Sequence, residues 1–404
     1  MQASTYPLLA AEEVARLVLE RTPVLPTEEL PVGDCTGRVL AAELRARAPL
    51  PGWPSSAVDG YAIRATDSGG WLRLVGESAA GRPFAGTLEP GSAVRVLTGG
   101  VLPAGADSVV MVEETRLDGD RVLTPAGYGT GRNFHAPGAD VEQGEVVLAA
   151  GEPLGAAELG LAAALGCAIL RVHRRPRIAL LSTGDELVEP GEAPAPGQIY
   201  DSNRYALKAA LLEAGADVTV LGIAPDSRRE LRELVESVLA DHDALVTSGG
   251  VSVGTHDLVK PLLEELGEVL VGRVKLRPGK PFTFAVLPAG RLAFGLPGFP
   301  VSSLVTFEVF VRPALRKMQG LRQLQRPLLP VRLGYDARAA GDRTEYQRVL
   351  LERDGNELVA RSTGSQSSSR LKSIAGAHAL VKIPPGEQGI AAGTRVEAVI
   401  LALP

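Results

Sequence analysis

The sequence predicts a multidomain α/β plus all-β protein: a central three-layer α/β domain with a mostly parallel sheet, a β-rich N-terminal arm and a small C-terminal β-barrel. The length of 404 residues corresponds to about two to four domains, since a domain has roughly 100–200 residues. Between residues 177 and 320, strand-like and helix-like segments alternate, which indicates right-handed βαβ crossovers. On both sides of that segment, short apolar runs alternate with Gly and Pro turns, as is typical of all-β regions.

Two domains are expected in the N-terminal part of the chain. Residues 9–20 have apolar side chains at helical spacing, and helical character returns at residues 155–165. We assign residues 1–45 and 148–173 to one discontinuous linking domain. Residues 46–147 contain short runs such as AVRVLTG and SVVMVEETRL between turns, which predicts a β-rich arm domain.

Residues 174–322 are assigned to the α/β domain because its predicted strands alternate with predicted helices. RIALLSTGDEL is expected to be a buried strand followed by a loop, and SNRYALKAALLEAGA an amphipathic helix. RLAFGLPGFP is expected to run from a strand into a turn, after which Ser302 and Ser303 open the last helix of the domain. Residues 323–404 return to short strands and are assigned to the C-terminal β-barrel.

Composition excludes several classes of function. With 42 basic and 47 acidic residues the net charge is −5, which argues against nucleic acid as a partner, since phosphate backbones require a basic face. Cys35 and Cys167 are far apart and form no CxxC pair, so neither a zinc site nor a disulfide framework is expected. The start of the chain does not resemble a signal peptide, and no apolar run is long enough to span a bilayer. We therefore expect a cytoplasmic enzyme that does not bind membranes.

Acidic residues follow three predicted strands of the α/β domain. Glu186 lies in STGDEL, Asp226 in APDS and Asp257 in SGGVSVGTHD. Ligands of parallel sheets bind beyond the carboxyl ends of the strands, so these side chains are candidates for one site. The alternative for Glu186 and Asp257 is helix N-capping, which needs no ligand.

The loop from Ser248 to Gly254 carries Gly249, Gly250 and Gly254 directly after a predicted strand. Glycines at such a position allow backbone N–H groups to approach a phosphate, with the positive end of a helix behind it. A tight turn between strand and helix is the alternative reason for the same glycines.

Alternating basic residues occupy the segment RVKLRPGKP. Strand alternation places Arg273, Lys275 and Arg277 on one face, and the Pro–Gly step allows Lys280 to rejoin them. Arginine forks suit phosphate or a tetrahedral oxyanion. A solvent-facing edge strand is the alternative interpretation of this pattern.

Seven motifs occur along the chain in the order SSAVDGYA, LTGGVLPAGAD, STGDEL, GQIYDSN, SGGVSVG, RPGKP and GLPGFPVSS. Together they resemble the molybdopterin molybdenumtransferases, the bacterial relatives of the gephyrin E domain. The resemblance covers essentially the whole chain, and the combination of motifs is far more specific than any one of them.

The resemblance implies an enzyme of molybdenum cofactor biosynthesis that inserts molybdate into adenylylated molybdopterin and releases AMP. It implies a dependence on a divalent metal, usually Mg²⁺, and a homodimer, with the linking domain in dimerisation and the active site in an intersubunit cleft. It also implies a molybdopterin adenylyltransferase as the upstream partner, and molybdoenzyme apoproteins or their chaperones downstream.

The resemblance also assigns roles to residues of this sequence. The catalytic positions are Asp59, Thr98, Asp140 and Glu186, although the first three are ordinary turn signals when taken alone. The metal positions are Glu186, Asp226 and Asp257. The substrate-binding positions lie in the α/β domain and the C-terminal domain: Ser248, Gly249, Gly250, Gly254, Arg273, Arg277, Lys280, Pro297, Gly298, Ser302, Arg348 and Ser368. Positions 273 and 277 are often lysine in relatives, and the loop TGSQSSSRLKS around Ser368 departs from their pattern in detail.

Two other classes of function are consistent with parts of the chain. A molybdopterin adenylyltransferase would need only the α/β segment, which leaves the other domains and the SSAVDGYA loop without a role. A non-catalytic gephyrin-like scaffold would leave the acidic strand ends without a role. Consumption of ATP, molybdate-dependent release of AMP, or neither distinguishes the three.

Overall fold

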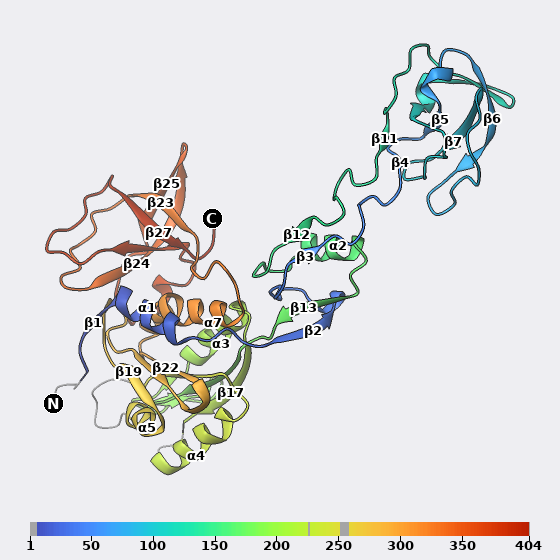
Figure 1. The fold of residues 1–404 in the computed structure, drawn as a ribbon. Helices are drawn as coiled ribbons and strands as arrows, with labels where there is room; N and C mark the ends of the chain where they lie inside the picture. The colour runs from blue at the N-terminus through green and yellow to red at the C-terminus, as the bar shows by residue number, and fades with distance from the viewer. Residues whose placement is uncertain (1–5, 225–226, 251–257, 404) are drawn as a thin grey trace.

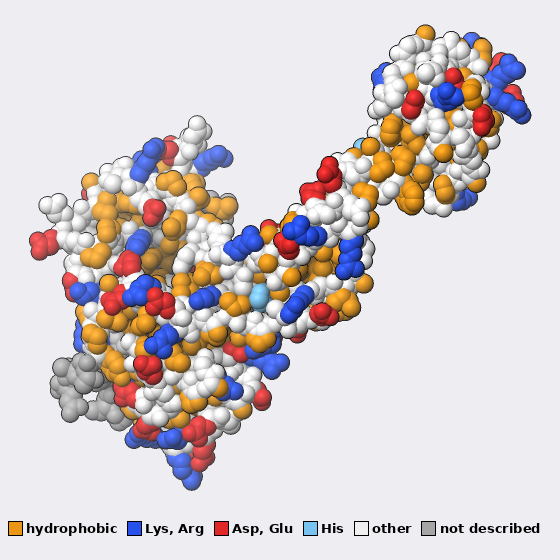
Figure 2. All heavy atoms as spheres, viewed as in Figure 1, with side chains coloured by type: hydrophobic (Ala, Val, Ile, Leu, Met, Phe, Trp, Pro, Cys, Tyr) orange, Lys and Arg blue, Asp and Glu red, His pale blue; other side chains and the backbone are white. Residues whose placement is uncertain are grey.

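The computed structural model describes residues 6–224, 227–250 and 258–403, and it confirms the predicted fold class. Figure 1 shows a body formed by the α/β domain and the C-terminal barrel, and an arm that lies apart from it at the end of a narrow connection. In the described residues, no helix is long and apolar enough to span a membrane. On the face in Figure 2, Lys and Arg side chains are interspersed with Asp and Glu.

The arm is built on a six-stranded sheet with the order β8-β5-β7-β6-β10-β9. Its strands are β5 (Gly60–Ile63), β6 (Trp71–Ser78), β7 (Ser92–Val96), β8 (Ser108–Met111), β9 (Arg116–Asp118) and β10 (Arg121–Leu123). Buried apolar side chains cover both faces of the sheet, with Tyr61 and Ile63 on one and Ala62 on the other. This alternation within one strand explains why SSAVDGYAI forms a buried strand with a loop before it.

Three antiparallel strand pairs connect the arm to the body. The chain leaves the body along β2 (Thr27–Pro31), β3 (Leu44–Arg45) and β4 (Ser55–Ser56) and returns along β11 (Phe134–His135), β12 (Val146–Leu148) and β13 (Ile169–His173). The pairs are β4 with β11, β3 with β12 and β2 with β13. Helix α2 (Ala156–Ala164) packs beside them, with Cys35, Leu154 and Ala162 in a common small core.

The α/β domain has a six-stranded sheet in which the first four strands pair in parallel and the fifth pairs antiparallel with both of its neighbours. In sheet order the strands are β17 (Asp217–Ile223), β14 (Arg177–Ser182), β18 (Ala244–Ser248), β22 (Leu292–Leu296), β21 (Thr283–Val286) and β19 (Glu268–Val271). A mostly parallel sheet is therefore confirmed.

Two layers of helices cover this sheet. Alternate residues of β14 pack in opposite directions: Ile178 and Leu180 belong to one core, Ala179 and Leu181 to the other. The first core includes α1 (Ala11–Arg21), α3 (Asn203–Glu213) and the continuous helical segment of α6 (Pro300–Thr306), a π-helical turn (Phe307–Val311) and α7 (Arg312–Met318). The second core includes α4 (Arg228–Leu239) and α5 (Val259–Leu266). A short parallel pair, β15 (Leu187–Val188) and β16 (Ile199–Tyr200), extends the loop after β14.

The C-terminal domain is a closed barrel, as predicted. Its five strands are β23 (Leu328–Leu333), β24 (Thr344–Asp354), β25 (Glu357–Ser362), β26 (Ala379–Ile383) and β27 (Arg395–Ile400). Pairings β23–β25, β25–β24, β24–β26, β26–β27 and β27–β23 close the ring. Closure leaves no free edge within these five strands, and Val349, Ala379 and Val381 fill the interior.

Two strands from outside the C-terminal sequence extend the barrel sheet. Strand β20 (Val274–Arg277) pairs in parallel with β24, and β1 (Leu9–Ala10) pairs in parallel with β20. The basic segment therefore joins the barrel rather than the α/β sheet, although it lies within the range assigned to the α/β domain. This pairing brings the end of β20 to the junction of the two domains, where the candidate site lies.

Candidate active site

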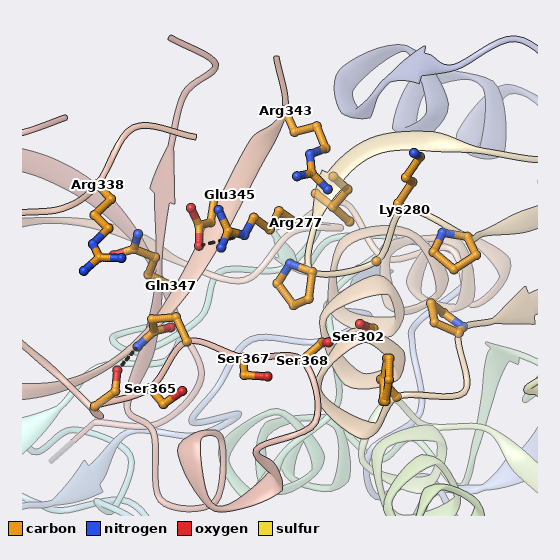
Figure 3. A pocket seen from close by; sticks show the side chains of 18 of the residues that line it. Arg277, Lys280, Ser302, Arg338, Arg343, Glu345, Gln347, Ser365, Ser367 and Ser368 are labelled. Carbon is orange, nitrogen blue, oxygen red and sulfur yellow. Dashed lines mark hydrogen bonds and ion pairs between the residues drawn. The ribbon is translucent and has the colours of Figure 1, made fainter. Parts of the chain in front are cut away.

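A pocket of about 1080 Å³ lies at the junction of the α/β domain and the barrel (Figure 3). The α/β side contributes the loop after β14, the turn after β20, and the turn between β22 and α6. The barrel side contributes the start of β24 and the loop that follows β25. Its walls therefore come from segments that are far apart in the sequence, and neither domain forms the pocket alone.

Seven of the predicted site residues line this one pocket. They are Glu186, Arg277, Lys280, Pro297, Gly298, Ser302 and Ser368. Ser302 stands in the first turn of α6, and its neighbour Val301 donates its backbone N–H to the carbonyl of Ser368 at 3.2 Å. This bond joins the barrel loop to the α/β domain and satisfies a helix N–H that has no partner within α6.

The basic strand β20 behaves only partly as predicted. Its residues alternate as expected, since Val274 and Leu276 are buried while Arg277 is exposed. The alternative of a free edge strand is wrong, because β1 and β24 pair with β20 on its two sides. Lys280 rejoins the strand through its carbonyl, which accepts the N–H of Val274.

Among the described residues, Arg273 and Lys275 do not line the pocket, whereas Arg277 and Lys280 do. Arg277 forms an ion pair with Glu345 on β24, with 3.6 Å between Nε and Oε1. The side chain of Glu345 is only 3 % exposed, while that of Arg277 is 48 % exposed. Arg277 therefore has two roles that its position permits: it neutralises a buried carboxylate and presents part of its guanidinium to the pocket (Figure 3).

Close packing accounts for the described glycines of the loop that follows β18. Gly249 and Gly250 have φ of 85° and 65°, which favours glycine. A β-carbon on Gly249 would lie 2.5 Å from the carbonyl oxygen of Thr183, and one on Gly250 would lie 2.7 Å from Thr183 Oγ1. The tight-turn interpretation thus accounts for both residues, and a phosphate contact stays a prediction. Gly254 lies outside the described residues.

Ser248, at the end of β18, is tied to the pocket by a residue that the sequence analysis missed. The Nδ2 group of Asn203 donates to Ser248 Oγ at 2.8 Å and to the carbonyl of Gly298 at 2.7 Å. Asn203 is the last residue of the GQIYDSN motif and begins α3. The motif itself was the available signal: polar residues at a helix start are usually explained as caps, but the N-cap residue of α3, Ser202, makes no side-chain capping bond.

The structure brings Asp59 and Thr98 together in the arm. Asp59 Oδ1 accepts the backbone N–H of Thr98 at 2.8 Å and the Thr98 hydroxyl at 2.9 Å. These two bonds stabilise the carboxylate and hold the pKa of Asp59 below its ordinary value. Both residues are exposed, so the pair presents a fixed negative charge at the surface. An ordinary turn was the alternative for Asp59, but the partner of its carboxylate lies in a distant loop of the same sheet.

Of the other acidic site candidates, the structure describes Asp140 and Glu186. Asp140 is exposed in a turn of the connection between arm and body, where its N–H donates to the carbonyl of Leu50. Asp226 and Asp257 lie outside the described residues, so Glu186 is the one predicted metal ligand that the structure places. Within the described ranges, no group of three or more His, Cys, Asp or Glu side chains is arranged to hold a metal ion.

Arg348 was expected to bind substrate, but the structure places it beneath the pocket wall. Its side chain is 0 % exposed, and its guanidinium donates to Ser373 Oγ and to the carbonyls of Ser367 and Tyr346. Desolvation by burial is the main cause that lowers the pKa of Arg348 to about 10. Arg348 is thus not among the residues that line the pocket, and its bonds support the loop above it; a contact between Arg348 and substrate stays a prediction.

Sequence reasoning also missed polar residues of the barrel that line the pocket: Tyr335, Arg338, Arg343, Glu345 and Gln347. The Tyr335 hydroxyl donates to Gln347 Oε1 at 2.7 Å, and burial raises the pKa of Tyr335 to about 12. The signal was the run TEYQR at the start of β24. Buried strand positions that carry Glu and Gln require polar partners, and such residues gather at binding sites.

The comparisons with known proteins agree with this geometry. Three family models match in chain order: the MoeA N-terminal region (domain I and II) at residues 9–166, a probable molybdopterin binding domain at 179–317, and the MoeA C-terminal region (domain IV) at 330–401. A molybdopterin molybdenumtransferase of a Nostoc species is 37 % identical, with 98 % of this chain and 94 % of that protein covered. The chain belongs to the molybdopterin molybdenumtransferase (MoeA) family.

Other members and relatives of the MoeA family extend the similarity. The molybdopterin molybdenumtransferase of Haemophilus influenzae is 34 % identical, with 96 % of this chain and 98 % of that protein covered. The crystal structure of the molybdopterin biosynthesis moeA protein from Pyrococcus horikosii has a TM-score of 0.83 and 31 % identity, and it covers 98 % of this chain and 99 % of its own. In this chain, the pocket lies where the second and third matched regions meet.

Proposed function

We propose that this chain is a molybdopterin molybdenumtransferase that inserts molybdate into adenylylated molybdopterin and releases AMP at the pocket described above. The observation that carries the proposal is the pocket wall of Arg277, Lys280 and Arg343, set beside the hydroxyls of Ser302 and Ser368 in a chain of the MoeA family. Cations and hydroxyl donors are the groups that bind oxyanions such as molybdate and phosphate.

The pocket must hold two anions that repel each other. Arg277 and Lys280 come from the α/β side and Arg343 from the barrel, so positive charge faces the cavity from both domains (Figure 3). Positive charge on both sides lowers the repulsion and holds the reactants at a fixed separation, which is how positioning contributes to rate. The volume of about 1080 Å³ is at the upper end for ligand pockets, as a large ligand such as a pterin with an attached nucleotide requires.

We propose that the enzyme depends on magnesium and that Glu186 binds it together with Asp226 and Asp257. Glu186 fits this role, because a carboxylate that lines the pocket is the oxygen ligand Mg²⁺ prefers, and Mg²⁺ often needs only one or two of them. When bound, the metal would polarise the phosphate linkage to AMP. Glu186→Gln is expected to raise the magnesium concentration needed for half-maximal turnover, and an unchanged magnesium titration would remove Glu186 from the metal site.

We propose that the active enzyme is a cytoplasmic homodimer, in which the arm of one copy completes the pocket of the other. The Asp59–Thr98 pair supports this, because it lies in the arm and the arm stands apart from the pocket of its own chain (Figure 1). An adenylyltransferase would supply the substrate, and molybdoenzyme apoproteins or their chaperones would accept the product.

The decisive experiment follows AMP release from purified adenylylated molybdopterin with and without molybdate. Release that requires molybdate supports the proposal. Consumption of ATP instead would identify an adenylyltransferase, although half of the pocket wall comes from a barrel which that activity does not need. The absence of both reactions would favour a scaffold.

A further inference from the structure

The loop that follows β25 forms much of the barrel wall of the pocket. We call residues 362–373 the serine loop; it supplies Ser365, Gln366, Ser367 and Ser368 to the pocket. After Ser362, the last residue of β25, the loop has no helix or strand before the 3-10 turn at Leu371–Ser373, so its shape depends on bonds to neighbouring segments.

Arg348 holds this loop from below with its side chain. The guanidinium Nη2 donates to the carbonyl of Ser367 at 3.2 Å, and Nε donates to Ser373 Oγ at the same distance. The two contacts lie near the middle and at the end of the loop. Because the guanidinium is rigid and planar, one buried side chain fixes both points relative to β24.

Gln366, within the serine loop, bonds to the backbone of Arg348. Its Oε1 accepts the N–H of Arg348 at 2.9 Å, and its Nε2 donates to the carbonyl of Arg348 at 3.1 Å. The ladder between β24 and β25 runs from Asp354 with Glu357 to Val349 with Ser362. The Gln366 amide therefore bonds to both backbone groups of Arg348 one residue beyond that ladder. The Arg348 carbonyl also accepts the backbone N–H of Thr363 at 3.3 Å and its hydroxyl at 3.2 Å.

The loop held in this way reaches the α/β domain. The carbonyl of Ser368 accepts the N–H of Val301 at 3.2 Å, beside Ser302 in the pocket. From these contacts we propose that Arg348 and Gln366 act as one positioning unit, which sets the serine loop against α6 so that the oxyanion side of the pocket is closed. The inference rests on the proposed function for its ligand, but not for the loop geometry.

Positioning of the serine loop by Arg348 and Gln366 predicts a different result from direct binding of the ligand by Arg348. If Arg348 contacted the oxyanion, Arg348→Met would weaken molybdate use without releasing the serine loop. Gln366 itself lines the pocket, so release of the loop is measured beside molybdate use in both variants. If the two residues position the loop, both variants raise the half-saturating molybdate concentration about tenfold, a change of about 1.4 kcal/mol. The double variant is then no worse than either single variant, because the loop is already released.

The experiment measures AMP release and amide hydrogen exchange in wild type, Arg348→Met, Gln366→Met and the double variant. Arg353→Met is the matched control, since it removes an exposed arginine from the other end of the same strand. We expect Arg348→Met and Gln366→Met to raise the half-saturating molybdate concentration. In both variants, kcat and the half-saturating concentration of adenylylated molybdopterin should stay within about twofold of the wild-type values. Exchange of residues 362–373 should rise in both variants and stay unchanged in the control.

Three results separate the possibilities. Faster exchange of the serine loop with unchanged molybdate dependence in both variants would overturn the inference, because the anchors would then be purely structural. Unchanged exchange would overturn it as well. If wild type shows no molybdate-dependent release of AMP but both variants still release the loop, then the proposed function fails while the anchoring by Arg348 and Gln366 stands. Because Arg348 is buried, Gln366→Met keeps the test open if Arg348→Met does not fold.

Discussion

At the residue scale, Asp59 shows how a short sequence signal acquires a chemical role through a distant partner. Its loop is an ordinary turn in the sequence, whereas in the structure two donors of Thr98 fix one carboxylate oxygen. The backbone N–H is the larger cause of the lowered pKa and the hydroxyl the second. Because the folded pKa is depressed, this stabilisation is present above the unfolded pKa and is lost as the pH falls through the folded pKa.

Thr98→Val tests this assignment. The substitution removes the hydroxyl and keeps the backbone N–H, so the pKa of Asp59 should rise part of the way to its ordinary value. The change is measured by NMR titration of the Asp59 carboxyl carbon. Thr115→Val is the control, since its exposed hydroxyl donates to the carbonyl of Val112 in the same domain. An equal Asp59 titration in wild type and Thr98→Val would show that the hydroxyl does not stabilise the carboxylate.

Arg277 illustrates what strand alternation could not reveal. The pattern predicted a row of cations, and Arg277 does line the pocket, but its ion pair with the buried Glu345 depends on a pairing between distant strands. Arg277→Ala should therefore weaken molybdate use and also cost about 1–3 kcal/mol of stability, because a buried carboxylate loses its partner.

The double variant Arg277→Ala/Glu345→Gln separates these two effects. Removing the buried charge should restore most of the free energy of unfolding, measured by urea denaturation, without restoring the half-saturating molybdate concentration. The molybdate defect should shrink at high salt, because salt screens the wild-type attraction. Recovery of both properties together would mean that Arg277 acts only through Glu345.

At the element scale, the α/β domain was predictable because each strand and helix has a local signature. The strand RIALLS and the helix after GQIYDSN are both found, as β14 and α3. The pairing of β1 and β20 with the barrel was not predictable, since a strand of two to four residues acquires its partner only through tertiary packing. The barrel wall of the pocket was not predictable for the same reason, because that wall depends on the pairing of β24 with β20.

The glycine loop after β18 gives an element-scale prediction about packing. Ala at position 250 would place a β-carbon 2.7 Å from both Thr183 Oγ1 and Val259 Cγ2, at a φ of 65°. Gly290 is the matched control, because its φ is 74° and a β-carbon there meets nothing within 4 Å. Gly290→Ala should cost about 1 kcal/mol of stability for the backbone strain alone. Gly250→Ala should cost about 1–3 kcal/mol more for the overpacking.

Chemical denaturation of the two variants measures this difference directly. Equal losses would mean that the loop relaxes around the new methyl group, and the glycine would then be required for another reason, such as the approach of a phosphate to the backbone. A larger loss in Gly250→Ala supports the tight-turn interpretation.

At the scale of the whole molecule, the arm and the pocket each carry predicted site residues, but the sequence does not show how the two parts come together. The motifs that carry Asp59 and Thr98 lie in the arm, while Glu186, Arg277 and Ser368 lie at the pocket. In one copy the arm extends away from the body (Figure 1). A single chain therefore separates residues that one reaction would use, and closed symmetry of two copies is the simplest way to bring them together.

Mixing two inactive variants tests whether a second copy completes the site. Asp59→Asn keeps an oxygen that can accept both Thr98 bonds, so the arm should fold normally while turnover falls about 10²–10⁴-fold, as expected for loss of an acid–base group. At a magnesium concentration that only half-saturates the wild type, Glu186→Gln should lose turnover through the pocket instead. If each site combines the arm of one copy with the pocket of the other, random mixing restores intact sites in half of the dimers, one site in each. The refolded mixture should then regain about a quarter of wild-type turnover. If arm and pocket of the same chain act together, every site in the mixture carries one defect and activity does not return, which would assign the arm a role outside the reaction.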